Sequence, residues 1–140
     1  MPSPTEITVS QLARLIGLPS APAIIDVRIQ DDAAADPRLI PGSRCHDYKA
    51  VAQWAGAYAD RPVVVVWQKG QKISQGSAAW IRTLGVEAQS REGGSEAWKA
   101  AGQLLMSPAN LPARDDRGRT VWVTRARPKV DRIACPWLIR

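Results

Sequence analysis

One stretch decides the fold: Val63-Val64-Val65-Val66-Trp67-Gln68-Lys69-Gly70-Gln71-Lys72-Ile73-Ser74. The valines predict a strand that is buried on both faces, and the loop around Gly70 leads into a helix that we expect to begin near Ser74. In α/β proteins such a junction lies outside the carboxyl end of the sheet, where N–H groups of the loop and of the helix start point at one spot. We therefore expect the functional site here.

Strands and helices alternate on both sides of this stretch. The predicted strands are 6–9, 23–28, 43–47, 63–67 and 86–90, and the predicted helices are 11–16 with Ser10 as N-cap, 48–58, 75–84, and a short helix after Gly93-Gly94 that runs through Ala101. Residues 29–38 are interpreted as a loop that can include a helical turn. This alternation predicts an α/β fold with a mostly parallel central sheet and helices on both faces. We expect Trp54, Trp80 and Trp98 to face the core.

The chain divides into a domain, a linker and a basic tail. Residues 1–102 hold the alternating elements, residues 103–119 are interpreted as a linker, and residues 120–140 begin a further domain with a strand at 120–124. Of the net charge of +6, residues 114–140 contribute +5, with 8 basic and 3 acidic side chains. The extended C-terminal tail is either a solvated terminus or a segment that meets nucleic acid or another acidic partner.

Composition excludes several kinds of site. The chain has two cysteines, Cys45 and Cys135, and one histidine, His46. These are too few for a disulfide framework, a zinc cluster or a histidine-based triad, so we expect no metal and no cofactor. No apolar run is long enough to span a bilayer, and the first residues lack the pattern of a signal peptide. We therefore expect a cytoplasmic protein with no membrane partner.

Four landmarks occur in a recognisable order along residues 6–101. They are Asp26-Val27-Arg28 after an apolar strand, Ile40-Pro41-Gly42-Ser43, the valine-rich strand with glycine at the fourth position of its loop, and Glu92-Gly93-Gly94 followed by Ala97-Trp98. Together they resemble a single rhodanese domain. The resemblance implies a rhodanese-like fold whose loop carries a cysteine that accepts sulfane sulfur as a persulfide. When Gly70 is aligned with the family's glycine, Trp67 takes the position of that cysteine.

Trp67 removes the nucleophile from this arrangement. Sulfur transfer needs a thiolate, whereas an indole has an N–H donor and a π face but no lone pair that could carry sulfur. The sequence therefore favours a domain with no catalytic residue, and not an enzyme. Cys45 is the alternative sulfur carrier, because the strand that leads to it should open on the same side of the sheet. Its other interpretation is a small buried hydrophobe.

The rest of the loop keeps the features of an anion site. Its members are Gln68, Lys69, Gly70, Gln71, Lys72, Ile73 and Ser74. Two lysines beside a helix start suit a tetrahedral oxyanion such as sulfate or chromate. The alternative is an exposed loop with two solvated lysines that holds an anion only weakly, because Trp67 fills the space that the ligand needs.

The tail carries a second resemblance. Residues 121–140 include the run Arg125-Ala126-Arg127-Pro128-Lys129 and end in Cys135-Pro136-Trp137-Leu138-Ile139-Arg140. They resemble the opening of the C-terminal domain of ChrB-type chromate-resistance proteins, which implies a role in chromate response. The basic side chains suit phosphate contacts if the intact protein binds nucleic acid. The sequence thus predicts a non-catalytic rhodanese-like module of a chromate-resistance or regulatory protein. The alternative is a sulfurtransferase that uses a non-standard cysteine such as Cys45.

Overall fold

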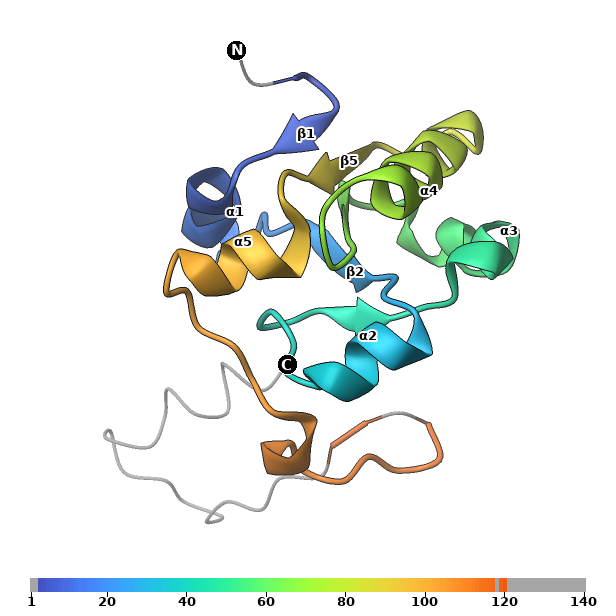
Figure 1. Ribbon diagram of the computed structural model, residues 1–140. Coiled ribbons are helices and arrows are strands. Elements are labelled where there is room, and N and C mark those ends of the chain that lie inside the picture. The colour runs from blue at the N-terminus through green and yellow to red at the C-terminus, as the bar shows by residue number, and fades with distance from the viewer. Residues whose placement is uncertain (1–2, 118, 121–140) are drawn as a thin grey trace. The chain divides into compact units, whose positions relative to one another are not determined.

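The computed structural model describes residues 3–117, 119 and 120. The chain divides into two compact units, Met1–Asn110 and Leu111–Arg140, and every helix and strand of the described residues lies in the first (Figure 1). The predicted strand residues 121–124 and Cys135 lie outside the described part of the chain. Across the described residues, no helix combines the length and the apolar character that crossing a membrane requires.

Short elements build the first unit. The strands are β1 (Glu6–Ile7), β2 (Ala23–Asp26), β3 (Arg44–Cys45), β4 (Val63–Val66) and β5 (Ala88–Arg91). The α-helices are α1 (Val9–Leu15), α2 (Gln30–Ala35), α3 (Val51–Trp54), α4 (Lys72–Thr83) and α5 (Gly94–Ala100). Three 3-10 helices accompany them, η1 (Tyr48–Ala50), η2 (Ala55–Tyr58) and η3 (Pro108–Asn110).

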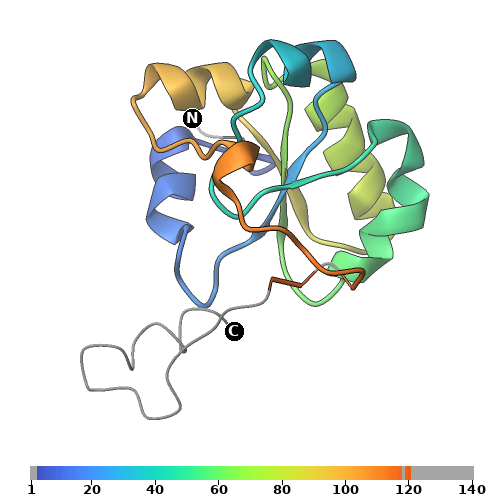
Figure 2. The ribbon, with the colours of Figure 1, turned by 90° about the horizontal axis from the view of Figure 1, so that it is seen from below.

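The described strands form one sheet in the order β1-β5-β4-β2-β3, and every neighbouring pair is parallel. Figure 2 shows the sheet between two groups of helices, with α1 (blue) and α5 (gold) on one side and α3 and α4 (green) on the other. Two core clusters match these layers, one on each face of the sheet. The predicted α/β fold with a parallel sheet and helices on both faces is confirmed.

Strand β4 occupies the middle of the sheet and supplies both cores. Its four valines are each 1% exposed or less. Side chains alternate along a strand, so Val63 and Val65 pack with the cluster beneath α3 and α4, while Val64 and Val66 pack with Trp98 beneath α1 and α5. Burial of one valine side chain contributes about 1.5–3 kcal/mol, which explains why an unbroken apolar run occupies this position.

The first helix begins earlier than predicted, because Thr8 and not Ser10 is its N-cap. The Gln11 backbone N–H donates to the Thr8 hydroxyl at 3.2 Å, and the Thr8 N–H donates to the Gln11 side-chain oxygen at 2.9 Å. This reciprocal capping box satisfies two N–H groups that a helix start otherwise leaves open. Since the helix takes Val9, the predicted strand 6–9 shortens to β1.

Two further predictions about helices were wrong. Residues 30–35 form the helix α2 where a loop was predicted; Asp31 and Asp32 lie in its first turn, where negative charge favours the helix dipole. Trp80 was expected in the core but is 42% exposed, whereas Trp54 and Trp98 are buried as predicted. Helix α4 buries the face that carries its small residues and Ile81, and this face leaves Trp80 at the side.

The segment after α5 folds back onto the first unit. The Trp98 indole N–H donates to the Leu104 carbonyl at 2.9 Å. Leu39 and Met106 form an antiparallel bridge, with both N–H···O distances at 2.8 Å. Residues 103–110, within the range interpreted as a linker, therefore belong to the compact unit that ends at Asn110.

A buried ion pair ties the end of β2 to the segment after α2. The Arg28 Nε donates to both Asp26 carboxylate oxygens, at 2.9 and 3.2 Å, and the two side chains are 4% and 7% exposed. The remaining guanidinium nitrogens donate to the carbonyls of Asp36 at 2.7 Å and Arg38 at 3.0 Å. One side chain thus joins these two segments at the carboxyl end of the sheet.

Asp26→Asn should lower the free energy of unfolding by about 3 kcal/mol, because it leaves the Arg28 cation buried without its counter-charge. Urea unfolding followed by circular dichroism measures the change. Asp60→Asn is the matched control, since the Asp60–Arg61 pair is exposed and should leave the midpoint nearly unchanged. Equal midpoints for both variants would contradict a structural role for the Asp26–Arg28 pair.

Candidate functional site

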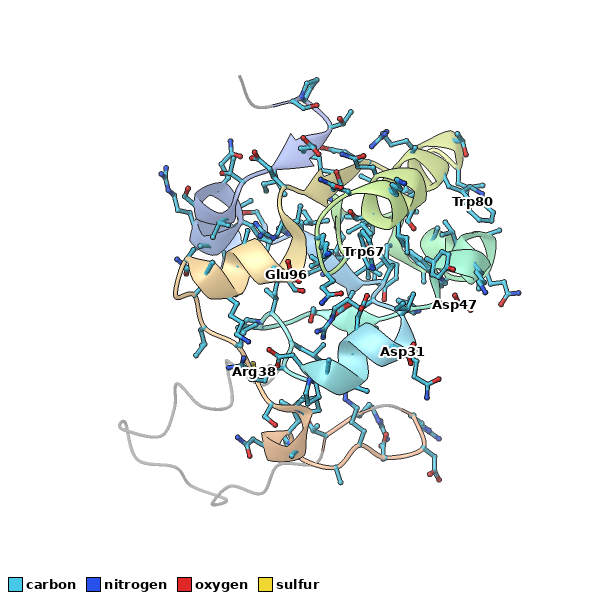
Figure 3. The ribbon with its side chains drawn as sticks, in the orientation of Figure 1. Asp31, Arg38, Asp47, Trp67, Trp80 and Glu96 are labelled. Atoms are coloured by element: carbon cyan, nitrogen blue, oxygen red, sulfur yellow. The ribbon has the colours of Figure 1, made fainter. Side chains whose placement is uncertain are left out.

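The site lies where β4 ends, at the carboxyl edge of the sheet. Trp67 follows the last residue of β4, and a short loop joins it to α4, which begins at Lys72 and so earlier than predicted. Lys69, Gln71 and Lys72 are exposed, whereas Gly70 is buried. Figure 3 shows Trp67 near the centre of the molecule, close to Glu96 at the start of α5. The loop is therefore held between α4 and α5.

Two glycines allow the loop to lie directly on the start of α5. Gly70 has a φ of +68°, and a Cβ there would lie 2.5 Å from the Gly93 nitrogen and 2.6 Å from the Arg91 carbonyl oxygen. A Cβ on Gly94, whose φ is +58°, would in turn collide with the carbonyl oxygens of Trp67 and Gln68. Both residues are in the left-handed region, so only glycine fits either position without strain.

Hydrogen bonds fasten this contact. The N–H groups of Ser95 and Glu96, at the start of α5, donate to the carbonyls of Trp67 and Gln68 at 2.9 and 3.0 Å. Arg91 stabilises the same turn, because its Nε and Nη2 both donate to the Gly94 carbonyl. Burial lowers the pKa of Arg91 to about 10, with Glu92 opposing the shift, so this side chain stays cationic at neutral pH.

The backbone N–H groups of residues 68–74 form a row of free donors. None of the described residues accepts a hydrogen bond from any of them, and the Ser74 hydroxyl donates to the Gln71 carbonyl at 3.0 Å and so does not cap them. Lys69 and Lys72, both exposed, form no ion pair with a described residue. Free N–H groups at a helix start and two ammonium groups make this loop electropositive. We call residues 68–74 the N–H cradle.

The Trp67 side chain lies against the core, on the side of α3 and α4. It packs against the same cluster as Val63, Val65 and Ile73. Its Nε1 is buried and has no hydrogen-bond partner among the described residues. This indole is therefore an unsatisfied donor beside the N–H cradle. Leaving such a buried donor unpaired costs about 1–3 kcal/mol.

Cys45 ends β3 at the same edge of the sheet but on the other face. It pairs with Asp26, which pairs with Val66, and Val66 points toward α1 and α5. Side chains of paired residues in neighbouring parallel strands point to the same face of the sheet. The Cys45 side chain therefore points away from the face on which Trp67 packs. Burial raises the pKa of the Cys45 thiol, the Asp26 carboxylate raises it further, and Arg28 only partly offsets them. The thiolate that sulfur chemistry needs is thus disfavoured here.

The side chain of His46, the residue after Cys45, is held by contacts with aromatic residues. Its Nε2 and the Tyr58 hydroxyl are 2.8 Å apart, and its ring stacks on Trp54 with centroids 4.8 Å apart. Burial lowers the pKa of His46, and Arg44 adds to the shift. These contacts lie on the α3 side of the sheet, so the imidazole is not placed to activate the Cys45 thiol. Among the described residues, no group of three His, Cys, Asp or Glu side chains could hold a metal ion.

Sequence reasoning missed two hollows that border the loop. A charged cavity of about 250 Å³ lies beside Gln68, where Arg38 holds the pKa of Asp36 well below its usual range, burial opposes the shift and Lys99 supports it. A groove of about 590 Å³ lies between η1 and α4. The helix α2, had it been predicted within residues 29–38, would have pointed to the cavity. Gly76, one helical turn before Trp80, was the sequence feature that could have indicated the groove.

A family model for the rhodanese-like domain matches residues 8–101, which is most of the chain. The chain belongs to the rhodanese-like family. A second model, for the C-terminal domain of ChrB, matches residues 122–140, outside the described residues. The comparison with curated proteins gives no match. The rhodanese-like domain is thus followed in the chain by a ChrB-type sequence, in the order that the two resemblances predicted.

Solved structures share the fold of this rhodanese-like domain. A rhodanese-related protein from Thermoplasma volcanium is 20% identical over 72% of this chain and 96% of its own, with a TM-score of 0.62. A thiosulfate sulfurtransferase from Pseudomonas aeruginosa is 22% identical over 85% of this chain and 22% of its own, with a TM-score of 0.66. A possible tyrosine phosphatase from Rhodopseudomonas palustris is 22% identical over 72% of this chain and 83% of its own, at 0.65.

Alkylation of Cys45 should show a pH midpoint above that of an ordinary thiol, because its folded-state pKa is raised and the thiolate forms only at higher pH. Iodoacetamide labelling of a Cys135→Ser variant, followed by mass spectrometry from neutral to alkaline pH, measures it. The same variant in concentrated urea provides the unperturbed reference. A folded midpoint below the unfolded one would contradict the environment described for Cys45 and would favour it as a sulfur carrier.

Proposed function

We propose that this rhodanese-like domain is a non-catalytic module of a cytoplasmic chromate-resistance or regulatory protein, and that it binds a tetrahedral oxyanion at the N–H cradle. A rhodanese-like domain followed by the start of a ChrB C-terminal domain is compatible with a chromate-resistance module. The proposal has two parts, the loss of sulfur chemistry at Trp67 and the retention of anion binding by residues 68–74.

The loss of sulfur chemistry follows from the side chain at the end of β4. Trp67 aligns with the cysteine of the family when Gly70 is matched to the family's loop glycine. A persulfide needs a thiolate that attacks sulfane sulfur, and an indole offers neither a thiolate nor an ionisable group near neutral pH. The domain is therefore proposed to have no sulfurtransferase activity of its own.

The observation that carries the anion proposal is the row of N–H groups at residues 68–74 without an acceptor in the described chain. N–H groups of buried and half-buried residues are normally paired, so the free donors of Gln68, Gly70, Ile73 and Ser74 support an external acceptor. Sulfate and chromate are tetrahedral dianions with four oxygens, and both match converging donors at a helix start. Lys69, Lys72 and the buried Arg91 cation add positive charge around the same loop.

The position of the Trp67 side chain is compatible with anion binding at the loop. Its ring packs into the core beneath α3 and α4, and its N–H has no acceptor among the described residues. A ring that packs inward leaves the N–H groups of the loop exposed to an approaching anion. This geometry supports anion binding over the competing interpretation, in which the indole fills the ligand's place.

The alternative function, sulfur transfer through Cys45, has one observation in its favour. Cys45 is free and exposed at the carboxyl edge of the sheet. Its raised pKa and its position on the opposite face from Trp67 both weaken that reading. A thiosulfate:cyanide assay separates the two functions, because only the alternative predicts turnover that disappears in Cys45→Ser.

Sulfate should bind the full chain, and Lys69→Ala with Lys72→Ala should weaken binding at least about tenfold, since a hydrogen bond to a charged group contributes about 1.5–3 kcal/mol. Isothermal titration calorimetry at constant ionic strength measures the affinity, with sodium chloride replacing sulfate as the blank. A chromate titration compares the second candidate anion.

Arg14→Ala is the matched control, because Arg14 is an exposed cation in the last turn of α1 and distant in sequence from the loop. It should leave sulfate affinity unchanged. Heats that do not exceed the chloride blank, or equal affinities for the lysine variant and the Arg14 control, would contradict oxyanion binding at the N–H cradle.

A further inference from the structure

The groove between η1 and α4 combines exposed apolar and basic side chains. It has a volume of about 590 Å³. Its lining includes Tyr48 and Lys49 from η1 and Lys72, Ile73, Gly76 and Trp80 from α4. Figure 3 shows Trp80 at the rim of the molecule beside α4, away from Trp67. The groove thus lies outside the N–H cradle, and only the first turn of α4 is common to both.

An apolar stripe runs along this side of α4. Ile73, Trp80 and Leu84 are separated by seven and then four positions, which places them on one side of a helix. Trp80 is 42% exposed and Leu84 is 47% exposed, although both are large apolar residues. The stripe spans about 16 Å, from the helical rise of about 1.5 Å per residue. Large exposed apolar side chains on one side of a helix are typical of an interaction site.

Gly76 leaves a gap in the middle of the stripe. It lies four positions after Lys72 and four before Trp80, and a Cβ added there would meet no atom within 4 Å. Glycine in a helix interior costs about 1 kcal/mol relative to alanine, so it does not serve the stability of α4. The gap has room for a side chain that enters from outside.

The charged side chains that line the groove are positive. Lys49 and Lys72 are both exposed, and neither forms an ion pair with a described residue. The Lys49 Nζ lies 5.7 Å from the centroid of the Tyr48 ring, which keeps the ammonium group at the groove. None of the described residues that line the groove is acidic. A complementary ligand is therefore anionic as well as apolar.

We propose that this groove docks an acidic segment of a partner protein. An apolar side chain of the segment enters the gap at Gly76 and packs against Trp80, while flanking carboxylates meet Lys49 and Lys72. A polypeptide fits better than a nucleic acid, because the stripe extends to the aliphatic side chains of Ile73 and Leu84, which offer no face for stacking a base. Helical and extended peptides recognise grooves by such combinations of apolar anchors and flanking charges.

This docking surface is independent of the oxyanion proposal. Lys72 belongs to both sites, so the test relies on Lys49 and Gly76, which lie outside residues 68–74. Loss of sulfate binding with intact peptide binding would contradict only the proposed function. The opposite result would contradict only the docking surface.

A random peptide library displayed on phage, panned against the full chain, tests the proposal without knowledge of the partner. The enriched peptides should carry acidic residues around a large apolar residue. Their affinity for the chain should fall at least about tenfold in Lys49→Glu and in Gly76→Leu, since interface anchors contribute about 2 kcal/mol or more. Gly76→Leu should fold at least as stably as the original chain, because it replaces an exposed helical glycine.

Arg14→Glu is the matched control, with the same change of charge on α1, and it should bind the peptides unchanged. Enrichment of basic or neutral peptides, no enrichment, or equal binding by Gly76→Leu would overturn the proposal. A thymidine oligonucleotide that binds the original chain and is lost in Gly76→Leu would assign the groove to nucleic acid instead. Self-association in sedimentation that Gly76→Leu abolishes would make a second copy the occupant, and would likewise overturn it.

Discussion

The close approach of two glycine backbones holds this site together. Gly70 in the loop and Gly94 at the start of α5 lie so near that a Cβ on either would enter the other's backbone. The contact brings the carbonyls of Trp67 and Gln68 onto the first N–H groups of α5, and these bonds satisfy the helix start. Since the carbonyls turn toward α5, the loop is left with N–H groups that have no partner in the described chain. The free N–H groups on which the proposed anion binding rests follow from this contact.

The same constraint explains how chemistry and scaffold could separate. The central strand β4, the buried pair of Asp26 and Arg28, and the two glycines position the loop through contacts that do not involve the side chain of residue 67. A tryptophan there gains burial against the core and gives up nucleophilicity, while the backbone donors are unaffected. Under the proposed function, this scaffold serves as a binding module without a reactive side chain at residue 67. The basic groove beside α4 would then bind a partner protein, while the loop binds only a small anion.

Patterns that depend on local sequence predicted most of this structure. The four valines of β4, the alternation of elements and the landmark Gly70 gave the parallel sheet and the place of the loop, because burial on two faces requires unbroken apolar residues. Thr8 and α2 were missed, since capping and a short acidic helix depend on hydrogen bonds and dipole effects rather than periodicity. Trp80 was misplaced because periodicity shows a helix but not which face the core takes. The contact of Gly70 with Gly94 joins distant parts of the chain, so the free N–H groups could be seen only in the structure.

In the proposed function an electropositive cradle lies beside residue 67, and a thiol placed at residue 67 reports on that cradle directly. Trp67→Cys in a Cys45→Ser, Cys135→Ser background carries one thiol, whose pKa is measured from the pH dependence of alkylation in the folded chain and in urea. Free donors and nearby cations stabilise a thiolate, so the account predicts a folded pKa below about 7.5, against about 8.5 for an ordinary cysteine. A folded pKa equal to or above the value in urea would contradict the account.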